Sequence, residues 1–309
     1  MTLFEQPGAN ADASDSDRCV VCGAHLPPEV NVKVRLLDRH YLQACSECGT
    51  WLYLPRHKPA EQVSIHDDEL YFDHPYFKLR RNANEGQRRR CRGIFARINM
   101  GIDCSSLRGQ RLLDIGCDTG VFLQIAAEEF GIVPVGIDVS KRAVSSAREC
   151  GIEAYRFTIE EAPENLRDFA VITAIDLIEH VTDPISFLTE IRRRLRPGGV
   201  VYVETPNIRS AVYDAGRLLS LVSRGRAAAL LDRLFPPQHI QYFTRTSLAQ
   251  MAGISGLEVV HLDTRVLPST DVAASLPIRA SVAALQLVDR LAGNRILICA
   301  LLRRSVSGT

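Results

Sequence analysis

The feature that most constrains this chain is an alternation of short apolar runs with longer amphipathic segments, which starts at Gln110. The amphipathic segments carry helix signals: Ser140 suits an N-cap, Gly151 suits the residue after a helix, and Pro184 suits a first helical turn. Strands that alternate with helices of ~10–15 residues form βαβ units around a parallel sheet, which predicts an α/β fold. The predicted strands are residues 111–116, 134–138, 152–157, 169–175, 200–205, 257–267 and 295–302.

The first of these strands ends in a glycine-rich turn, Asp114-Ile115-Gly116-Cys117-Asp118-Thr119-Gly120, which opens the following helix. Glycine lets the backbone approach a ligand closely, and a helix N-terminus presents unpaired N–H groups. The next strand ends in Asp138, whose carboxylate can accept hydrogen bonds from ribose hydroxyls. This combination predicts a nucleoside cofactor, and the turn does not have the G-x-G-x-x-G pattern of dinucleotide sites.

The turn resembles motif I of the class I S-adenosylmethionine-dependent methyltransferases, which usually reads acidic-x-Gly-x-Gly-x-Gly. The resemblance implies that Asp114 supports the turn and the cofactor's amino group, that residues 116–120 wrap its methionine part, and that Asp138 holds its ribose. Val139 and Ser140 would lie near the adenine, and Ala174 and Ile175 would lie beside the cofactor crevice. The implied cofactor site is Asp114, Gly116, Cys117, Asp118, Gly120, Asp138, Val139, Ser140, Ala174 and Ile175.

Asp118 departs from this family's motif, in which the middle glycine usually stands at that position. Aspartate tolerates a left-handed backbone better than most residues, so one reading is a tolerated variant. A second reading is a weakened or retuned cofactor site, in which the carboxylate faces the cofactor's ammonium or sulfonium. A third is a non-catalytic protein that binds the cofactor or assists assembly, for which Asp118 is the one hint.

Residues 172–207 extend the resemblance, because they contain D-x-x-E-H-x-x-D-P, L-R-P-G-G and T-P-N. These motifs are typical of a methyltransferase subgroup that acts mostly on small molecules such as sugars, quinones and lipid precursors. The match covers residues 108–207 and continues loosely to the last strands. It implies a Rossmann-like sheet with an antiparallel last strand, and methyl transfer to an oxygen, nitrogen or carbon of a small-molecule acceptor.

Two histidines are candidate general bases, because imidazole titrates near neutral pH. His180 follows the fourth strand of the alternation, and His239 lies in an irregular segment after two prolines. The alternative for His180 is a structural pair with Glu179, and for His239 it is core packing or a loop tie. The acceptor pocket is predicted to be walled by Tyr71, Phe72, Tyr76, Asn207 and Tyr242.

Four of the nine cysteines form the pattern C-x₂-C … C-x₂-C, at Cys19, Cys22, Cys45 and Cys48. Four thiolates make a closed tetrahedral site that suits structural Zn²⁺. A redox dithiol and unliganded thiols are the alternatives. The odd number of cysteines and the scatter of the other five fit a reducing compartment, so the sequence predicts a cytoplasmic protein.

The charge balance bears on partners. With 37 basic and 36 acidic residues the net charge is +1, which argues against nucleic acid as the main partner. Basic runs at 78–81 and 88–92 keep an rRNA or tRNA methyltransferase open as an alternative, with the zinc lobe contacting RNA. No apolar run reaches ~18 residues, so no membrane span is predicted.

The chain divides into segments with different expected roles. Residues 1–17 resemble a disordered leader without a secretion signal, and residues 18–60 a zinc-ribbon-like lobe. Residues 61–107 are expected to form a helical connector that covers the substrate. By the resemblance, residues 108–309 are expected to form the methyltransferase domain, with 207–250 as a cover or lid. The helical part of that cover is cationic and amphipathic, so it could contact a lipid surface or a second copy in a homodimer.

Overall fold

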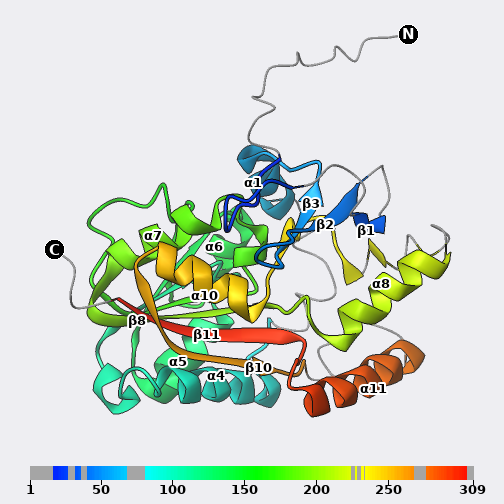
Figure 1. Cartoon of the computed structure of the whole chain (residues 1–309). Coiled ribbons are helices and arrows are strands. Elements are labelled where there is room, and N and C mark those ends of the chain that lie inside the picture. The colour runs from blue at the N-terminus through cyan, green and yellow to red at the C-terminus, as the bar shows by residue number, and fades with distance from the viewer. Residues whose placement is uncertain are drawn as a thin grey trace, which may run out of the picture.

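A computed structural model describes residues 17–26, 32–35, 40–67, 81–223, 227, 231–232, 234–267 and 276–304. Within these residues a seven-stranded sheet is covered by helices on both faces, and a four-stranded sheet lies beside it (Figure 1). The predicted α/β class is therefore confirmed.

The large sheet has the strand order β10-β11-β8-β7-β4-β5-β6. Strands β4 to β8 run parallel, and β11 runs antiparallel to both of its neighbours, as expected for the last strand. Its strands are β4 (Arg111–Ile115), β5 (Val133–Asp138), β6 (Glu153–Arg156), β7 (Phe169–Ile175), β8 (Leu195–Pro206), β10 (Leu257–Arg265) and β11 (Leu297–Arg304).

Helices cover the sheet because neighbouring strand residues point to opposite faces. Leu112 packs with apolar residues of α4 (Glu85–Ile98) and α5 (Val121–Phe130). The next residue, Leu113, packs with those of α7 (Pro184–Arg194) and α10 (Arg245–Ile254) on the other face (Figure 1). A further helix, α6 (Lys141–Glu149), and a short 3₁₀ helix, η2 (Cys104–Leu107), complete this domain.

The predicted helix signals are present. Ser140 caps α6 by accepting from the Ala143 N–H at 3.4 Å, and Gly151 follows that helix with φ 79°. Pro184 lies in the first turn of α7 as predicted, and Asp183, which was not predicted, caps that helix by accepting from the Ser186 N–H at 2.9 Å. These caps satisfy N–H groups that the first helical turn leaves unpaired, and they fix where each helix leaves the carboxyl edge of the sheet.

The small sheet joins distant segments in the order β1-β2-β3-β9. Its strands are β1 (Val32–Arg35), β2 (Tyr41–Ala44), β3 (Trp51–Leu54) and β9 (Gln241–Tyr242). After β3 comes α1 (Pro59–Asp67), whose last residue accepts from the Lys141 N–H at 2.9 Å and from Arg156 at 2.8 Å. The lobe that carries the cysteines is thus joined to the large-sheet domain through β9 and through α1. The segment boundaries at 60 and 108 stay predictions.

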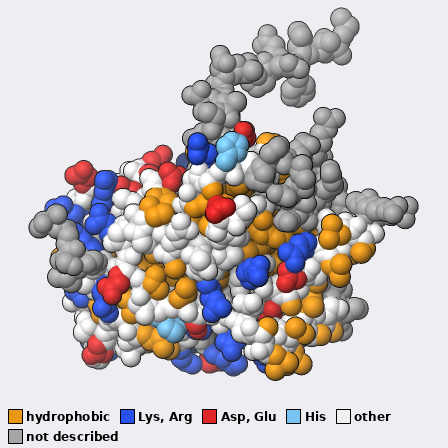
Figure 2. All heavy atoms as spheres, in the orientation of Figure 1, with side chains coloured by type: hydrophobic (Ala, Val, Ile, Leu, Met, Phe, Trp, Pro, Cys, Tyr) orange, Lys and Arg blue, Asp and Glu red, His pale blue; other side chains and the backbone are white. Residues whose placement is uncertain are grey.

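Two helices form an exposed apolar face. They are α8 (Ala211–Ser223) and α11 (Leu276–Ala292), and Figure 2 shows hydrophobic side chains gathered there at the lower right. Within the described ranges no helix is long and apolar enough to cross a membrane. The contact of this face with lipid or with a second copy stays a prediction. Its exposed side chains are Leu218, Leu221, Val222, Leu287, Val288 and Leu291.

Candidate functional site

A cavity of about 820 Å³ opens at the carboxyl ends of β4, β5 and β7. Ligands bind in this crevice in open α/β sheets. Its walls also include α1, α4 and the short helix η3 (Ile178–His180). The sequence-predicted residues that line it are Asp114, Gly116, Cys117, Asp118, Asp138, Val139, Ser140, Ile175 and His180.

The turn between β4 and α5 follows a left-handed path. Gly116, Asp118 and Gly120 have φ values of 74°, 45° and 79°. A Cβ on Gly120 would lie only 3.2 Å from the Cβ of Ala147, so glycine meets both the backbone and the packing requirement there. Asp118 adopts the conformation that aspartate tolerates, so the turn keeps its shape without the middle glycine.

Two acidic residues stand at the ends of their strands. Asp138 accepts from the Ser140 N–H at 2.8 Å and from the Asp118 N–H at 3.0 Å, and burial raises its pKa to about 6. Asp114 accepts from the Thr173 hydroxyl at 2.6 Å, and burial raises its pKa to about 7. The backbone therefore orients Asp138 at the cavity wall, and Asp114 is tied to the neighbouring strand.

A buried polar cluster lies at the η3 end of the cavity. The carboxylate of Glu179 and the rings of His180 and His239 bring one ligand atom each to within 4.8 Å of one another. The ring of His66, from α1, lies 4.6 Å from that of His180 between centroids. His180 Nδ1 is 2.8 Å from the Gln238 carbonyl, which can only accept, so Nδ1 carries the proton and Nε2 is the acceptor.

Burial sets the charge state of this cluster. It lowers the pKa of His180 well below its usual range, and that of His239 to about 4. It raises the pKa of Glu179 well above its usual range. In the described part of the chain, Glu179 Oε1 and His239 Nδ1 are buried without a hydrogen-bond partner. A carboxyl group and an imidazole in this position can exchange a proton with a ligand. Carboxylate and imidazole are also groups that coordinate divalent cations.

Other predicted residues lie away from the cavity lining. Ala174 is buried inside β7, and His239 stands beside His180 with 4.7 Å between ring centroids. The Asn207 amide donates to the Arg295 carbonyl at 2.8 Å, which ties the residue after β8 to the segment just before β11. The predicted roles of these residues are not tested by this geometry.

Of the four aromatic residues predicted to contact the acceptor, the structure describes only Tyr242. Tyr242 is buried in β9, and its ring packs 5.5 Å from that of Tyr213. Its role in acceptor binding stays a prediction. Three further predicted residues lie outside the described ranges: Tyr71, Phe72 and Tyr76.

Two arginines of the cavity wall were missed in the sequence. Arg81 pairs with Asp118 at 2.9 Å, and Arg90 lies 3.0 Å from Asp176 and 2.8 Å from Glu204. Both belong to the basic runs at 78–81 and 88–92, which keep RNA open as a partner in the sequence analysis. A signal for Arg90 was available, because it precedes the apolar positions 94 and 98 by one and two helical turns and so shares their buried face.

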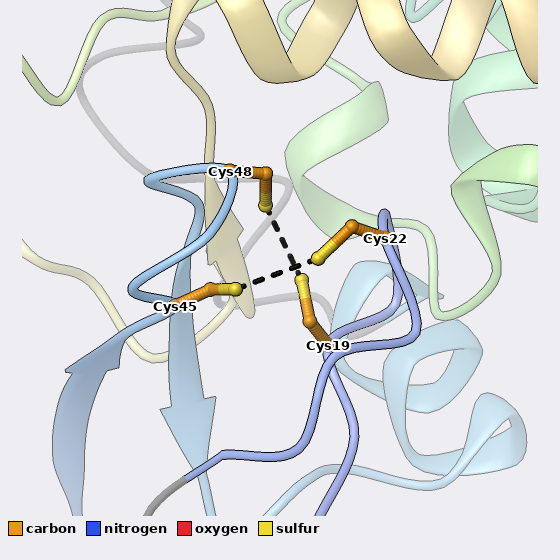
Figure 3. Close-up of side chains that lie close together, drawn as sticks. All are labelled: Cys19, Cys22, Cys45 and Cys48. Carbon is orange, nitrogen blue, oxygen red and sulfur yellow. Dashed lines mark hydrogen bonds between the residues drawn. The ribbon is translucent and has the colours of Figure 1, made fainter.

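The four cysteines of the two pairs converge as predicted (Figure 3). Cys19 and Cys48 have their sulfurs 3.5 Å apart, as do Cys22 and Cys45. A tetrahedral zinc with sulfur ligands at ~2.3 Å needs sulfur separations of about 3.8 Å, so the cluster fits this ion. A disulfide needs ~2.05 Å, so these cysteines are free thiols.

The cluster is also tied to the domain that contains the large sheet. The hydroxyl of Thr244, the N-cap of α10, donates to the Cys48 carbonyl at 3.4 Å. The next residue, Gly49, packs against the same threonine, since a Cβ there would lie 3.3 Å from its methyl group. The turn that carries Cys45 and Cys48 therefore packs against the start of α10.

The sequence matches the family described as "Methyltransferase domain" over residues 83–262. It is 31% identical over 174 residues to the ubiquinone biosynthesis O-methyltransferase of Aliivibrio fischeri strain MJ11, covering 52% of this chain and 73% of that protein. It is 33% identical to the protein of that name from Vibrio vulnificus strain YJ016, covering 49% and 68%.

Solved structures agree on the fold. Phosphoethanolamine N-methyltransferase 2 from Haemonchus contortus, in complex with S-adenosyl-L-methionine, matches with a TM-score of 0.54 at 16% identity, over 79% of this chain and 60% of that one. A SAM-dependent methyltransferase from Archaeoglobus fulgidus matches with a TM-score of 0.50 at 16% identity, over 74% and 100%. With the family match over more than half of its length, the chain belongs to the methyltransferase domain family and is an S-adenosylmethionine-dependent methyltransferase.

Proposed function

We propose that this enzyme methylates a hydroxyl oxygen of a small-molecule acceptor. The observation that carries the proposal is that the glycine-rich turn and His180 face one continuous cavity of about 820 Å³. Pockets for small ligands span ~300–1,000 Å³, so this one lies in the upper part of the range. The O-methyltransferase names of the relatives support an oxygen acceptor.

The cofactor would lie along the carboxyl edge of β4 and β5. Asp138, already oriented by two backbone N–H groups, would accept from the ribose hydroxyls. Val139 and Ser140 follow it along the cavity wall and would border the adenine. When bound, the cofactor supplies a methyl group on a positively charged sulfur, and that sulfur keeps the electron pair of the broken carbon–sulfur bond. The residues of the chain align the two reactants and exclude water.

His180 is positioned to take the acceptor's proton. Its Nδ1–H is held by the Gln238 carbonyl, which leaves Nε2 as the proton acceptor. As the new oxygen–carbon bond forms, the hydroxyl proton would pass to this nitrogen. His239 packs edge-on against the ring and would fix its orientation. His239 thus acts as a positioning residue in this proposal, with direct proton transfer as the alternative.

The acceptor would be covered by α1. Pro59, Val63 and His66 of this helix line the cavity, opposite the strand ends. Because α1 directly follows β3, the cysteine lobe would set the position of the cover. The predicted acceptor contacts Tyr71, Phe72 and Tyr76 follow α1 in the sequence and remain part of the proposal.

We further propose that the four cysteines hold one structural Zn²⁺. The sulfurs have the separations a tetrahedral ion needs, and four protein ligands would leave no position for substrate. The ion would stabilise the lobe and through it α1. The odd number and the scatter of the nine cysteines in the sequence favour a reducing, cytoplasmic location.

The proposed reaction is tested with purified protein, S-adenosylmethionine and a panel of hydroxylated benzoates, with total RNA as a second acceptor. We expect a mass increase of one methyl group on an oxygen of a small acceptor, and none on RNA. His180→Ala should lower kcat by ~10²–10⁴-fold, with the affinity for S-adenosylhomocysteine unchanged. Methylated RNA, or a His180→Ala enzyme with normal kcat, would refute the assignment.

A further inference from the structure

A solvent-reaching ion pair forms part of the cavity wall beside the glycine-rich turn. Arg81 Nη2 lies 2.9 Å from Asp118 Oδ1, and Arg81 Nε lies 3.1 Å from both carboxylate oxygens. Both residues line the cavity. The side chains are 15% and 34% exposed, so the pair is open enough for a ligand to reach it.

Four other charged groups of this wall, Arg90, Asp176, Asp138 and Asp114, are held by partners, whereas Glu160, Glu161 and Asp183 line the cavity as exposed carboxylates. Arg90 is held by Asp176 and by Glu204, whose side chain is fully buried. Asp138 receives two backbone N–H groups, and Asp114 is buried against a threonine hydroxyl. The Arg81–Asp118 pair thus offers adjacent positive and negative groups at the surface of the cavity.

The place of the pair in the turn fits a ligand that carries both charges. Asp118 precedes the start of α5 by three residues, and Gly120, the N-cap of that helix, provides no side-chain cap. The helix N-terminus therefore adds partial positive charge next to Arg81, which favours a carboxylate there. The Asp118 carboxylate has about four lone-pair sites, so it can accept from an ammonium group while Arg81 stays close.

We propose that Arg81 and Asp118 form the receptor for the amino-acid end of the cofactor. Arg81 binds the α-carboxylate through its guanidinium fork, and Asp118 binds the α-ammonium. The two side chains pair with each other when the cofactor is absent, and each gains a partner of opposite charge when it binds. This inference rests on the cofactor position proposed above. It gives Asp118 a selective role that a glycine at this position cannot have.

The alternative role of the pair is a structural latch that holds residue 81 against the turn. A latch affects every ligand of the cavity alike, whereas a receptor acts only on ligands with an amino-acid end. Two probes separate the roles: S-adenosylhomocysteine carries that end, and 5′-methylthioadenosine has the same nucleoside without it. The readout is the ratio of their dissociation constants, measured by calorimetry on the full chain.

The variants are chosen so that the protein keeps its fold. Asp118→Asn removes the charge while retaining a residue that tolerates the φ of 45°, and Asp118→Gly relieves that backbone altogether. Arg81→Gln removes the other charge. The matched control is Arg88→Gln, because Arg88 pairs with Glu128 at 2.7 Å outside the cavity lining.

We expect each Arg81 and Asp118 variant to weaken S-adenosylhomocysteine binding by ~10–100-fold, the usual effect of a lost charge-assisted hydrogen bond. Binding of 5′-methylthioadenosine should change less than ~2-fold, and Arg88→Gln should change neither. Equal losses for both ligands, or no loss for either, would overturn the proposal. If the wild type binds neither ligand, the cofactor position and this inference fall together. Failure of acceptor methylation with intact cofactor binding would refute only the proposed reaction.

Discussion

Removing the charge of Arg265 should destabilise the fold through the carboxylate of Glu204. The Glu204 side chain is fully buried, and Arg265 approaches its two oxygens at 2.6 and 2.7 Å. Arg265→Met keeps the length of the side chain but leaves the carboxylate with Arg90 at 2.8 Å and the Tyr202 hydroxyl at 2.8 Å. Breaking a buried pair in this way costs ~3–5 kcal/mol, and because Arg90 remains we expect about 3 kcal/mol.

The assay is urea unfolding at pH 7, with Glu204→Gln and the double variant completing a cycle. The double variant should cost less than the sum of the single ones by more than ~1 kcal/mol, because it leaves no unpaired carboxylate. Although burial opposes the effect, Arg265 and Arg90 hold the pKa of Glu204 well below its usual range. The stabilisation is therefore complete above the unfolded pKa of ~4.3 and is lost as the pH falls below it. A penalty under ~1 kcal/mol at pH 7, or one that grows at low pH, would refute this reasoning.

Three further changes have defined outcomes. Purified protein should contain about one zinc per chain, and Cys45→Ser should lose it, as measured by metal analysis; metal-free protein with disulfides would contradict the site. Asp138→Ala should weaken S-adenosylhomocysteine binding by ~1–3 kcal/mol in calorimetry through lost ribose hydrogen bonds, and unchanged affinity would exclude that contact. Because the pKa of Asp138 is about 6 and ribose favours the ionised form, wild-type affinity should fall as the pH drops below 6, a trend that Asp138→Ala should lack. Gly136→Ala should lower thermal stability, since its Cβ would lie 2.6 Å from the Cys117 sulfur; an unchanged Tm would show that the turn can shift.

The sequence predicted local features with accuracy because their causes are local. The strand at 169–175 has the predicted bounds, since an uninterrupted apolar run identifies a buried parallel strand. The strand expected at 200–205 in fact begins at Leu195, which pairs with Phe169 across an irregularity in the ladder. Helix α7 ends at Arg194, and β8 starts with the next residue, so the strand already includes the Pro197-Gly198-Gly199 segment that precedes the predicted strand.

Contacts between distant segments were beyond the reach of the sequence pattern. Strand β9 has only two residues, which is too short for a periodicity to identify, and it exists because β3 provides a partner edge. The pairing of Arg81 with Asp118 likewise depends on how the segment before α4 crosses the turn. Residue type and spacing indicated which groups carry charge, but tertiary packing decides which of them meet.

The hydrogen bond between Thr244 and Cys48 has a consequence for the order of synthesis. These residues are 196 positions apart, so at ~5–20 residues per second the ribosome needs about 10–40 s after Cys48 to produce its partner. During that interval β3 has an unpaired edge, which is the kind of edge that invites pairing with other chains. A metal bound by the four thiolates at that stage would hold the two Cys-x₂-Cys turns together before β9 is made. We therefore expect zinc supply during translation, more than zinc added afterwards, to determine the yield of folded enzyme.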